Sequence, residues 1–304
     1  MNSPFDLDQQ DAYLAWREHK LAHAITCASD LIVEINDPLQ LTTAERSALI
    51  SRCNQSNMVI YATRTPIDEQ GLQHLGLQLG LKSLDANWLA GEQGISRITV
   101  SNNDGERQAY IPYTDRAIKW HTDGYYNPVD RQIRAMVLHC VSAAGEGGVN
   151  RVMDHEIAYL MLRDANPDFI RALSAMNAMT IPERTDEQGV ARTSQSGPVF
   201  FVDQQALHMR YTARTRSIEW KQDDATLAAV AALENLLASD SPHIHKVKLE
   251  PGMGLLCNNV LHDRSAFTDD TAQPRLLYRA RYLDRLDTLV VKLDTRSTAN
   301  WTVK

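Results

Sequence analysis

Several common sequence features are missing from this chain of 304 residues, and each absence narrows the choice of function. It contains no apolar run of about 18 residues, the length needed to cross a bilayer, so no membrane span is predicted. Its four cysteines lie far apart and form no CxxC pair, which argues against a disulfide framework and a structural zinc site. The N-terminus lacks the basic and apolar regions of a secretory signal, so we expect a cytoplasmic protein.

Basic residues are too few for a protein whose general partner is nucleic acid. Lys and Arg total 31 against 38 Asp and Glu, which gives a net charge of −7 at pH 7. Proteins that follow phosphate backbones carry the opposite balance. Neither GxGxxG nor GxxxxGK[ST] occurs, and no GxSxG indicates a serine hydrolase. We therefore expect a small molecule as partner, and neither nucleic acid nor a membrane.

Hydrophobic periodicity and capping residues predict helices mixed with short strands. Helices are predicted over 8–26, 43–53, 66–82, 154–164, 167–176 and 223–240. Strands are predicted over 57–64 and 134–142, and in the segments ISRITVS, SGPVFFVD, IHKVKLE and RLLYRARYLD. A turn is predicted at NNDG. Strands without regular helices between them argue against a doubly wound sheet. The chain has no repeat and no linker-like stretch, so we expect a single domain over 1–304 with an N-terminal helical extension at 1–40. The predicted fold is mainly β with flanking α-helices, arranged as a jelly-roll barrel.

The densest cluster of chemistry-bearing residues is AIKWHTDGYYNP. His121 and Asp123 are separated by one residue, so on an extended segment both side chains point to the same face and can approach one metal ion. Two histidines and one carboxylate form a site that leaves open positions for non-haem Fe(II) chemistry. His262, in NNVLHDRSAF, is the candidate for the missing ligand. An isolated HxD pair is also compatible with a polar turn that holds a hydrogen-bonded histidine.

Two arginines follow in the last predicted strand, PRLLYRARY. Arg275 lies 13 residues after His262, and Arg279 lies four residues further on. A planar guanidinium can pair with a carboxylate through two hydrogen bonds. Arg275 therefore suits the distal carboxylate of a 2-oxo acid whose other end binds the metal.

The order of four motifs resembles the Fe(II)/2-oxoglutarate-dependent dioxygenases of the taurine dioxygenase superfamily. The motifs are HTDG, LHCVSAAGEGGVNRVMD, NNVLHDRSAF and PRLLYRARYLD, and the similarity covers about residues 40–285. The middle stretches look closer to the γ-butyrobetaine and trimethyllysine hydroxylase branch. The resemblance implies a double-stranded β-helix, Fe(II), 2-oxoglutarate as cosubstrate, and O₂-dependent oxidation, most simply hydroxylation, of a small polar substrate with release of succinate and CO₂.

Carried over residue by residue, the resemblance implies three iron ligands: His121, Asp123 and His262. It makes Arg275 the partner of the distal carboxylate of 2-oxoglutarate. Asn150 stands where the family usually has a Thr or Ser hydroxyl that contacts 2-oxoglutarate. Arg279 matches an arginine that meets the substrate's anionic group, which favours an anionic or zwitterionic substrate. The alternative for Arg279 is an internal ion pair with a protein carboxylate.

Further substrate contacts are predicted with a structural alternative for each. Tyr125 and Tyr126 directly follow HTDG and would wall the substrate pocket, or pack at the mouth of a barrel. The segment MRYTARTRSIEW resembles a lid of the butyrobetaine branch and adds Arg210 and Tyr211, although its arginines also suit ion pairs at the surface. The tyrosines could instead enclose a quaternary ammonium group by cation–π contact.

Four alternatives remain open at this point. His243 and His245 share one face of a predicted strand, where a solvated edge is favoured over an accessory metal site. A jelly-roll metal-binding or sensor protein without 2-oxoglutarate turnover, or a cupin-like metalloenzyme that uses no 2-oxo acid, would not need Arg275. Relatives are often dimers or tetramers, so a homo-oligomer is an open alternative to a monomer.

Overall fold

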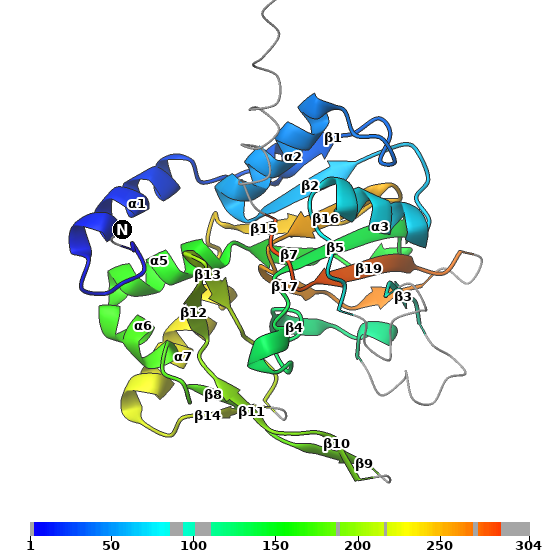
Figure 1. Cartoon of the computed structure of the whole chain (residues 1–304). Coiled ribbons are helices and arrows are strands. Elements are labelled where there is room, and N and C mark those ends of the chain that lie inside the picture. Colours follow the sequence, from blue (N-terminus) through cyan, green and yellow to red (C-terminus); the bar gives the residue numbers. More distant parts are fainter. Residues whose placement is uncertain are drawn as a thin grey trace, which may run out of the picture.

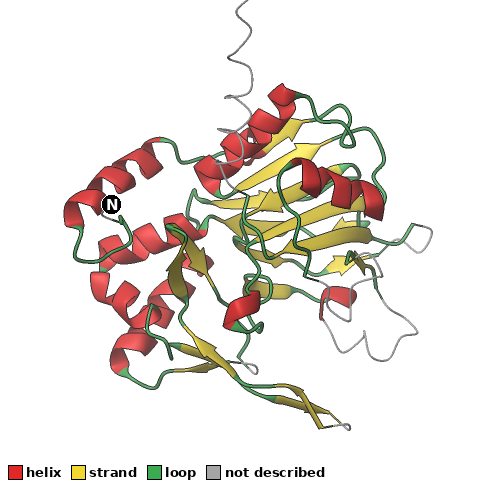
Figure 2. Ribbon diagram, viewed as in Figure 1, coloured by secondary structure: helices red, strands yellow, loops and turns green. Residues whose placement is uncertain are grey.

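The computed structural model of the protein describes residues 3–85, 94–100, 111–186, 189–215, 218–269 and 273–286. These residues form a mixed α/β fold in which a six-stranded and a four-stranded sheet are combined with six α-helices (Figure 1, Figure 2). The expected turn at NNDG lies outside the described residues. Within them, no helix is both long and apolar enough to cross a bilayer.

The six-stranded sheet forms the centre of the fold (Figure 1). Its strands in spatial order are β1 (Ile32–Glu34), β2 (Met58–Ala62), β16 (Met253–Cys257), β5 (Ala135–Ser142), β19 (Leu276–Tyr282) and β3 (Ser96–Ile98). β1 and β2 are parallel, and all other neighbours are antiparallel. α2 (Thr43–Ser56) and α3 (Glu69–Gln78) cover one face of this sheet, where Leu49 and Leu72 pack with Tyr61 and Val137.

The four-stranded sheet carries three residues of the predicted site, His121, Asn150 and His262. Its order is β15 (Ile244–Val247), β7 (Asn150–Met153), β17 (Leu261–Arg264) and β4 (Ile118–His121), and all pairs are antiparallel. The register places His262 of β17 directly opposite His121 of β4. Strand pairing therefore joins two residues that are far apart in the sequence.

A cavity separates the two sheets. Met136, Leu138 and Leu277 line it from the larger sheet, and Ile118 and His262 line it from the smaller sheet. This two-sheet layout agrees with the expected jelly-roll type, although the fold is mixed α/β rather than mainly β. The hydrogen-bonded pairs of the described strands leave the sheets separate, so closure into a barrel stays a prediction.

The remaining helices gather beside the smaller sheet (Figure 2). They are α1 (Gln10–Ala22), α5 (His155–Ala165), α6 (Pro167–Leu173) and α7 (Asp224–Ala238). Short sheets complete the fold. Three of them have two strands: β6 (Glu146–Gly147) with β18 (Phe267–Thr268), β9 (Arg184–Asp186) with β10 (Gly189–Arg192), and β12 (Phe200–Asp203) with β13 (Ala206–Met209). One has three strands, in which β8 (Met179–Ile181) lies between β11 (Gln195–Gly197) and β14 (Glu219–Trp220). The segment between α6 and α7 thus forms an arm of small sheets.

Local sequence explains where five of the six described helices begin. A side chain preceding the helix accepts a backbone N–H of the first turn at Thr42, Asp68, Asp154, Asn166 and Asp223. Such caps satisfy donors that the helix itself leaves unpaired. Thr42 and Glu45 form a reciprocal capping box. All six predicted helices are confirmed, with ends that differ by at most a few residues.

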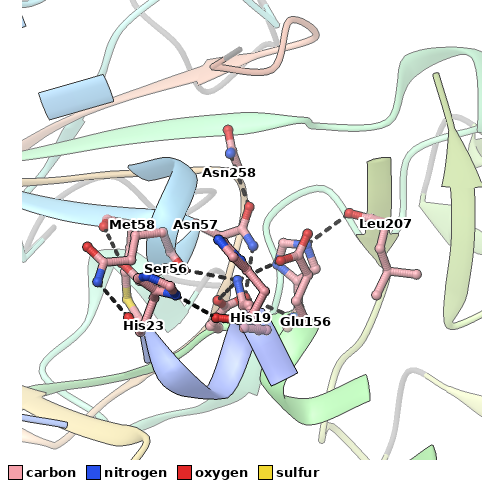
Figure 3. A network of polar contacts seen from close by, with 12 residues as sticks. His19, His23, Ser56, Asn57, Met58, Glu156, Leu207 and Asn258 are labelled. Carbon is pink, nitrogen blue, oxygen red and sulfur yellow. Dashed lines mark hydrogen bonds and ion pairs between the residues drawn. The ribbon is translucent and has the colours of Figure 1, made fainter. Parts of the chain in front are cut away.

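A buried polar network ties α1 to the core (Figure 3). Lys20 Nζ lies 2.7 Å from Asp154 and 2.6 Å from Glu156. Asn57 Nδ2 donates to Asp154 at 2.9 Å, and its Oδ1 accepts from Asn258 at 3.2 Å. A buried ammonium is costly without compensation, so the two carboxylates stabilise it in this position. The network fixes the N-terminal helix against the start of α5.

Candidate metal centre

Three predicted ligands, His121, Asp123 and His262, meet between the two sheets. One potential ligand atom from each lies within 4.8 Å of the others. The imidazole centroids are 4.2 Å apart, and His121 Nε2 is 3.8 Å from Asp123 Oδ1. Within the described part of the chain this is the one group of three or more His, Cys, Asp or Glu residues placed to hold a metal ion.

Backbone carbonyls orient both histidine rings for metal binding. Nδ1 of His121 is 2.9 Å from the carbonyl oxygen of Lys119, and Nδ1 of His262 is 2.9 Å from that of Val260. Because a carbonyl can only accept, each Nδ1 carries the proton and each Nε2 keeps a lone pair. The buried Oδ2 of Asp123 has no hydrogen-bond partner among the described groups. Two imidazole nitrogens and a free carboxylate oxygen fit a non-haem Fe(II) site.

The electrostatic environment keeps His121 and Asp123 in their metal-binding protonation states. Burial, followed by the neighbouring His262, lowers the pKa of His121 from 6.5 to about 3, which keeps the ring neutral. Burial alone raises the pKa of Asp123, but Arg279 and Arg281 outweigh it, and the pKa is lowered below its ordinary value. Arg279 lies 3.3 Å from Asp123 Oδ1. The carboxylate is therefore ionised at neutral pH.

Asn259 holds the backbone at Asp123, a role that the sequence analysis missed. Its Oδ1 accepts the Asp123 N–H at 2.7 Å, and its Nδ2 donates to the carbonyls of Asp123 and Ile133 at 3.0 and 2.9 Å. Asn259 has a φ of 52°, a conformation that asparagine tolerates better than most residues. The Asn-Asn pair before VLH was the available indication of such a turn.

The cavity beside the triad contains about 440 Å³ of space not filled by atoms, part of it open to solvent. His121, His262, Asn150, Arg275 and Arg279 all line it. Four residues of extended chain span about 13 Å, so Arg275 and Arg279 reach the cavity at two separate points. The triad histidines and Arg275 therefore border the same cavity, at separate points that an elongated anion would have to bridge.

Arg275 is a buried cation that forms no ion pair with the described part of the chain. It is 5% exposed. Burial lowers its pKa from 12.5 to about 10. The guanidinium carbon lies 4.9 Å from the centre of the Phe267 ring, and Arg264 approaches the same ring at 4.7 Å. Such a group is stabilised by a bound anion.

Arg264, two residues after His262, was not singled out from the sequence. It also lines the cavity and donates to the carbonyls of Pro112 and Thr114 at 3.4 and 2.7 Å. Burial, with a smaller contribution from the neighbouring Arg275, lowers its pKa to about 9. Arg264 thereby fixes the loop before β4 while adding positive charge to the cavity.

The double-glycine turn before β7 brings Asn150 to this cavity. Gly147 and Gly148 have φ values of 73° and 67°, and a Cβ on Gly147 would lie 2.2 Å from the carbonyl oxygen of Ala266. Glycine is therefore required for the close approach of the two chain segments. Asn150 is buried, and its Nδ2 has no partner among the described groups. This donor is free to reach a ligand beside Arg275.

The remaining predicted substrate residues occupy two different places. Tyr125 and Tyr126 lie next to the triad with ring centroids 5.2 Å apart, edge to face. Arg279, with Asp123 as its partner, has the ion pair that was its structural alternative, while its buried Nε is without a hydrogen-bond partner among the described groups. Tyr211 is fully buried and lines a separate groove between β4 and α7.

Arg210 is occupied by the protein itself. Its guanidinium donates to the carbonyls of Tyr125, Met179 and Gln195 at 2.6, 3.2 and 2.7 Å.

The expectation of a solvated strand edge is wrong for His245, which is 4% exposed. With His243 it lines a small cavity beside Lys20 and Asp154.

A facial triad of two histidines and an aspartate, placed in a two-sheet cavity with a buried arginine, defines a non-haem iron oxygenase that uses a 2-oxo acid. Family comparison agrees, since the model described as "Taurine catabolism dioxygenase TauD, TfdA family" matches residues 20–281. The chain belongs to this family. The expected class of Fe(II)- and 2-oxoglutarate-dependent dioxygenase is thereby confirmed.

Two curated relatives carry the name uridine-5′-phosphate dioxygenase. The one from Amycolatopsis sp. is 29% identical over 171 residues, which cover 54% of this chain and 60% of that protein. The one from Streptomyces sp. is 28% identical over 191 residues, which cover 60% and 68%. The match to the first relative thus spans less than two thirds of its length.

Solved structures show the same fold at low sequence identity. The non-heme iron oxygenase OrfP in complex with Fe and alpha-ketoglutaric acid has a TM-score of 0.61 and 14% identity, with 91% of this chain and 92% of that chain covered. Asparagine oxygenase in complex with Fe(II), 2S,3S-3-hydroxyasparagine and succinate has a TM-score of 0.55, 14% identity and the same coverage. Placement within the γ-butyrobetaine branch stays a prediction.

Proposed function

We propose that this protein oxidises, most simply by hydroxylation, a small polar substrate that carries an anionic group, with 2-oxoglutarate and O₂ as cosubstrates. The observation that carries the proposal is Arg275, a buried guanidinium without a described counter-ion in the same cavity as His121 and His262. A jelly-roll sensor protein would have no need for such an uncompensated charge at this place.

The residues of the chain divide the work as follows. His121, Asp123 and His262 would hold Fe(II), which when bound supplies the activation of O₂. Arg275 pairs with the distal carboxylate of 2-oxoglutarate, and the free Nδ2 of Asn150 donates to the same cosubstrate. The apolar walls of the cavity exclude water from the reacting groups.

The substrate class is supported from two directions. The names of the curated relatives make uridine 5′-phosphate a candidate, and the amino acids named with the solved structures make small zwitterions candidates. Arginines close to the triad favour an anionic group in either case. The proposed kinship with the γ-butyrobetaine branch rests on the middle motifs, LHCVSAAGEGGVNRVMD and NNVLHDRSAF, together with the segment MRYTARTRSIEW.

Anaerobic titration with Fe(II) and 2-oxoglutarate tests this function. We expect a visible charge-transfer band that requires both additions, and succinate release when a panel of uridine 5′-phosphate, nucleosides and amino acids is supplied with O₂. Asp123→Ala should lose the band and the succinate, whereas Thr42→Ala, a capping variant remote from the cavity, should keep both. A wild-type protein that shows no band, or an Asp123→Ala protein with full activity, contradicts the proposal.

A further inference from the structure

Arginines from three separate segments converge on the two tyrosines that follow the triad's aspartate. Arg281 of β19 donates to Tyr126 Oη at 2.9 Å, and Arg214 donates to Tyr125 Oη at 3.4 Å. The guanidinium carbon of Arg192, at the end of β10, lies 5.8 Å from the centre of the Tyr126 ring. We refer to these five residues as the arginine–tyrosine cluster.

Arg210 positions the arm that contributes two of these arginines. Its three hydrogen bonds join the backbone of Tyr125 to Met179 in β8 and to Gln195 in β11. The fit is close, since a Cβ on Gly197 would lie 3.1 Å from Arg210 Nη1. The arm is therefore fixed directly onto the segment that carries the metal ligand.

The cluster has an excess of positive charge. Arg281 is compensated by Asp85, whose Oδ2 lies 2.7 Å from its Nη2. Within the described residues, Arg192 and Arg214 form no ion pair. Arg192 donates to the carbonyl of Pro182 at 2.9 Å, but its buried Nε has no partner among the described groups. Two guanidinium charges are thus left for a ligand to neutralise.

None of the five cluster residues lines the proposed cosubstrate cavity. His121 and His262 line that cavity, whereas Tyr125 and Tyr126 do not. When 2-oxoglutarate extends from the metal centre towards Arg275, the substrate has to approach from the side that Tyr125 and Tyr126 border.

We propose that the arginine–tyrosine cluster binds a phosphate monoester group of the substrate through Arg192 and Arg214. The inference rests on the proposed function and adds the place and the charge of the group recognised. A phosphate monoester carries about −1.5 to −2 charges at pH 7, which matches two uncompensated guanidiniums. An amino acid offers a single carboxylate together with an ammonium group that the arginines repel. A quaternary ammonium is disfavoured for the same reason, because Arg192 already lies over the Tyr126 ring.

Isothermal calorimetry in phosphate-free buffer reads this site directly, without turnover. The probes are two matched pairs, uridine 5′-phosphate with uridine and phenyl phosphate with phenol, added anaerobically to the full chain with Fe(II) and 2-oxoglutarate. The phosphate of at least one pair should bind about 10-fold or more tightly than its neutral counterpart. Arg192→Gln and Arg214→Gln should each weaken phosphate binding roughly 10- to 100-fold, as expected for the loss of a hydrogen bond to a charged group.

Two controls separate this site from the rest of the protein. Arg171→Gln removes an exposed arginine that pairs with Asp168 on α6 and should leave phosphate binding unchanged. The charge-transfer band of Arg192→Gln and Arg214→Gln should equal that of the wild type, which shows that the fold and the metal centre are intact. Arg214→Lys should bind phosphate with intermediate affinity, since it keeps the charge but loses the planar fork.

The possible failures are distinguishable. A wild-type protein without the charge-transfer band overturns the proposed function, while calorimetry still reports on the cluster. The phosphate site is overturned if, in each probe pair, the phosphate binds no more tightly than its neutral counterpart. It is also overturned if Arg192→Gln and Arg214→Gln both bind phosphate as tightly as the wild type. Tighter binding of L-asparagine or L-arginine than of either phosphate, lost in the same variants, overturns it in favour of amino-acid recognition.

Discussion

Replacing Arg275 by methionine should change two measurable quantities in opposite directions. The side chain is buried, lacks a described counter-ion and stacks on Phe267. Methionine fills a similar volume without charge. We expect the ligand-free variant to be more stable than the wild type and to bind 2-oxoglutarate far more weakly.

The stability effect follows from the pKa of Arg275. Burial lowers it from 12.5 to about 10, and at roughly 1.36 kcal/mol per pK unit the charged group costs the folded protein about 3 kcal/mol. Because the pKa of a base is lowered, this cost is fully present below the folded-state value and disappears as the pH rises through the unfolded-state value. Loss of the contact with Phe267 offsets about 1 kcal/mol, which leaves a gain of about 2 kcal/mol at neutral pH.

The binding effect follows from the loss of one partner of a desolvated charge pair. Such a loss costs about 2–5 kcal/mol, or roughly 30-fold to several-thousand-fold in affinity. Saturation with ligand at about 1,000 times its Kd stabilises the wild type by about 4 kcal/mol. When Fe(II) and 2-oxoglutarate are added, the wild type should therefore reach the stability of the variant if affinity falls about 30-fold, and exceed it for a larger loss.

Urea unfolding with and without Fe(II) and 2-oxoglutarate measures the first effect, and titration of the charge-transfer band measures the second. Arg275→Lys serves as the matched variant, since it keeps the charge but loses the two-pronged hydrogen bond, and its affinity should be intermediate. An Arg275→Met protein that binds 2-oxoglutarate like the wild type would falsify the assignment. The carboxylate partner would then be Arg264, the other arginine stacked on Phe267 in this cavity.

Three further predictions concern the scaffold of the site. Burial lowers the pKa of His139 from 6.5 to about 4, so between these two pH values only the unfolded chain binds this proton. The wild type therefore loses unfolding free energy as the pH falls through this range, and in His139→Asn that loss should be smaller by about 3 kcal/mol. An unchanged pH dependence in urea unfolding contradicts this. Gly147→Ala should destabilise the protein by about 1–3 kcal/mol, measured in the same way, because of the positive φ and the contact with Ala266; a neutral effect would show that the turn relaxes easily. Asn150→Ala should raise the Kd for 2-oxoglutarate about 5- to 10-fold and Asn150→Thr should largely restore it, whereas equal affinities in all three proteins exclude the contact.

Much of this architecture is readable from short stretches of sequence because the forces involved are local. Helix caps act within one turn, so Thr42 with Glu45 marks the start of α2 without knowledge of the fold. The HxD motif marks two ligands one residue apart, and the structure brings both to the triad, His121 from the end of β4 and Asp123 from the turn that follows. The motif order around them was enough to indicate the family.

Other features depend on chain segments that meet only in the folded protein. Arg210 in MRYTAR looks like a ligand contact in the sequence, but carbonyls of three distant segments use its hydrogen bonds. Tyr211, its neighbour, is turned into a groove beside α7 because successive residues of an extended chain point to opposite sides. His245 is buried beside a small cavity that Lys20 and Asp154 also line, and no local pattern predicts that these segments meet.

The metal centre combines both kinds of information. Residue types and spacing indicate which groups can bind iron, because ligand chemistry belongs to the side chain. Whether an arginine pairs with a protein carboxylate depends on register and on what packs opposite. Arg279 has Asp123 as its partner, whereas Arg275 of the same segment has no described counter-ion. Charge compensation acts through space, over segments far apart in the chain, so only the folded arrangement reveals the guanidiniums that still lack a partner.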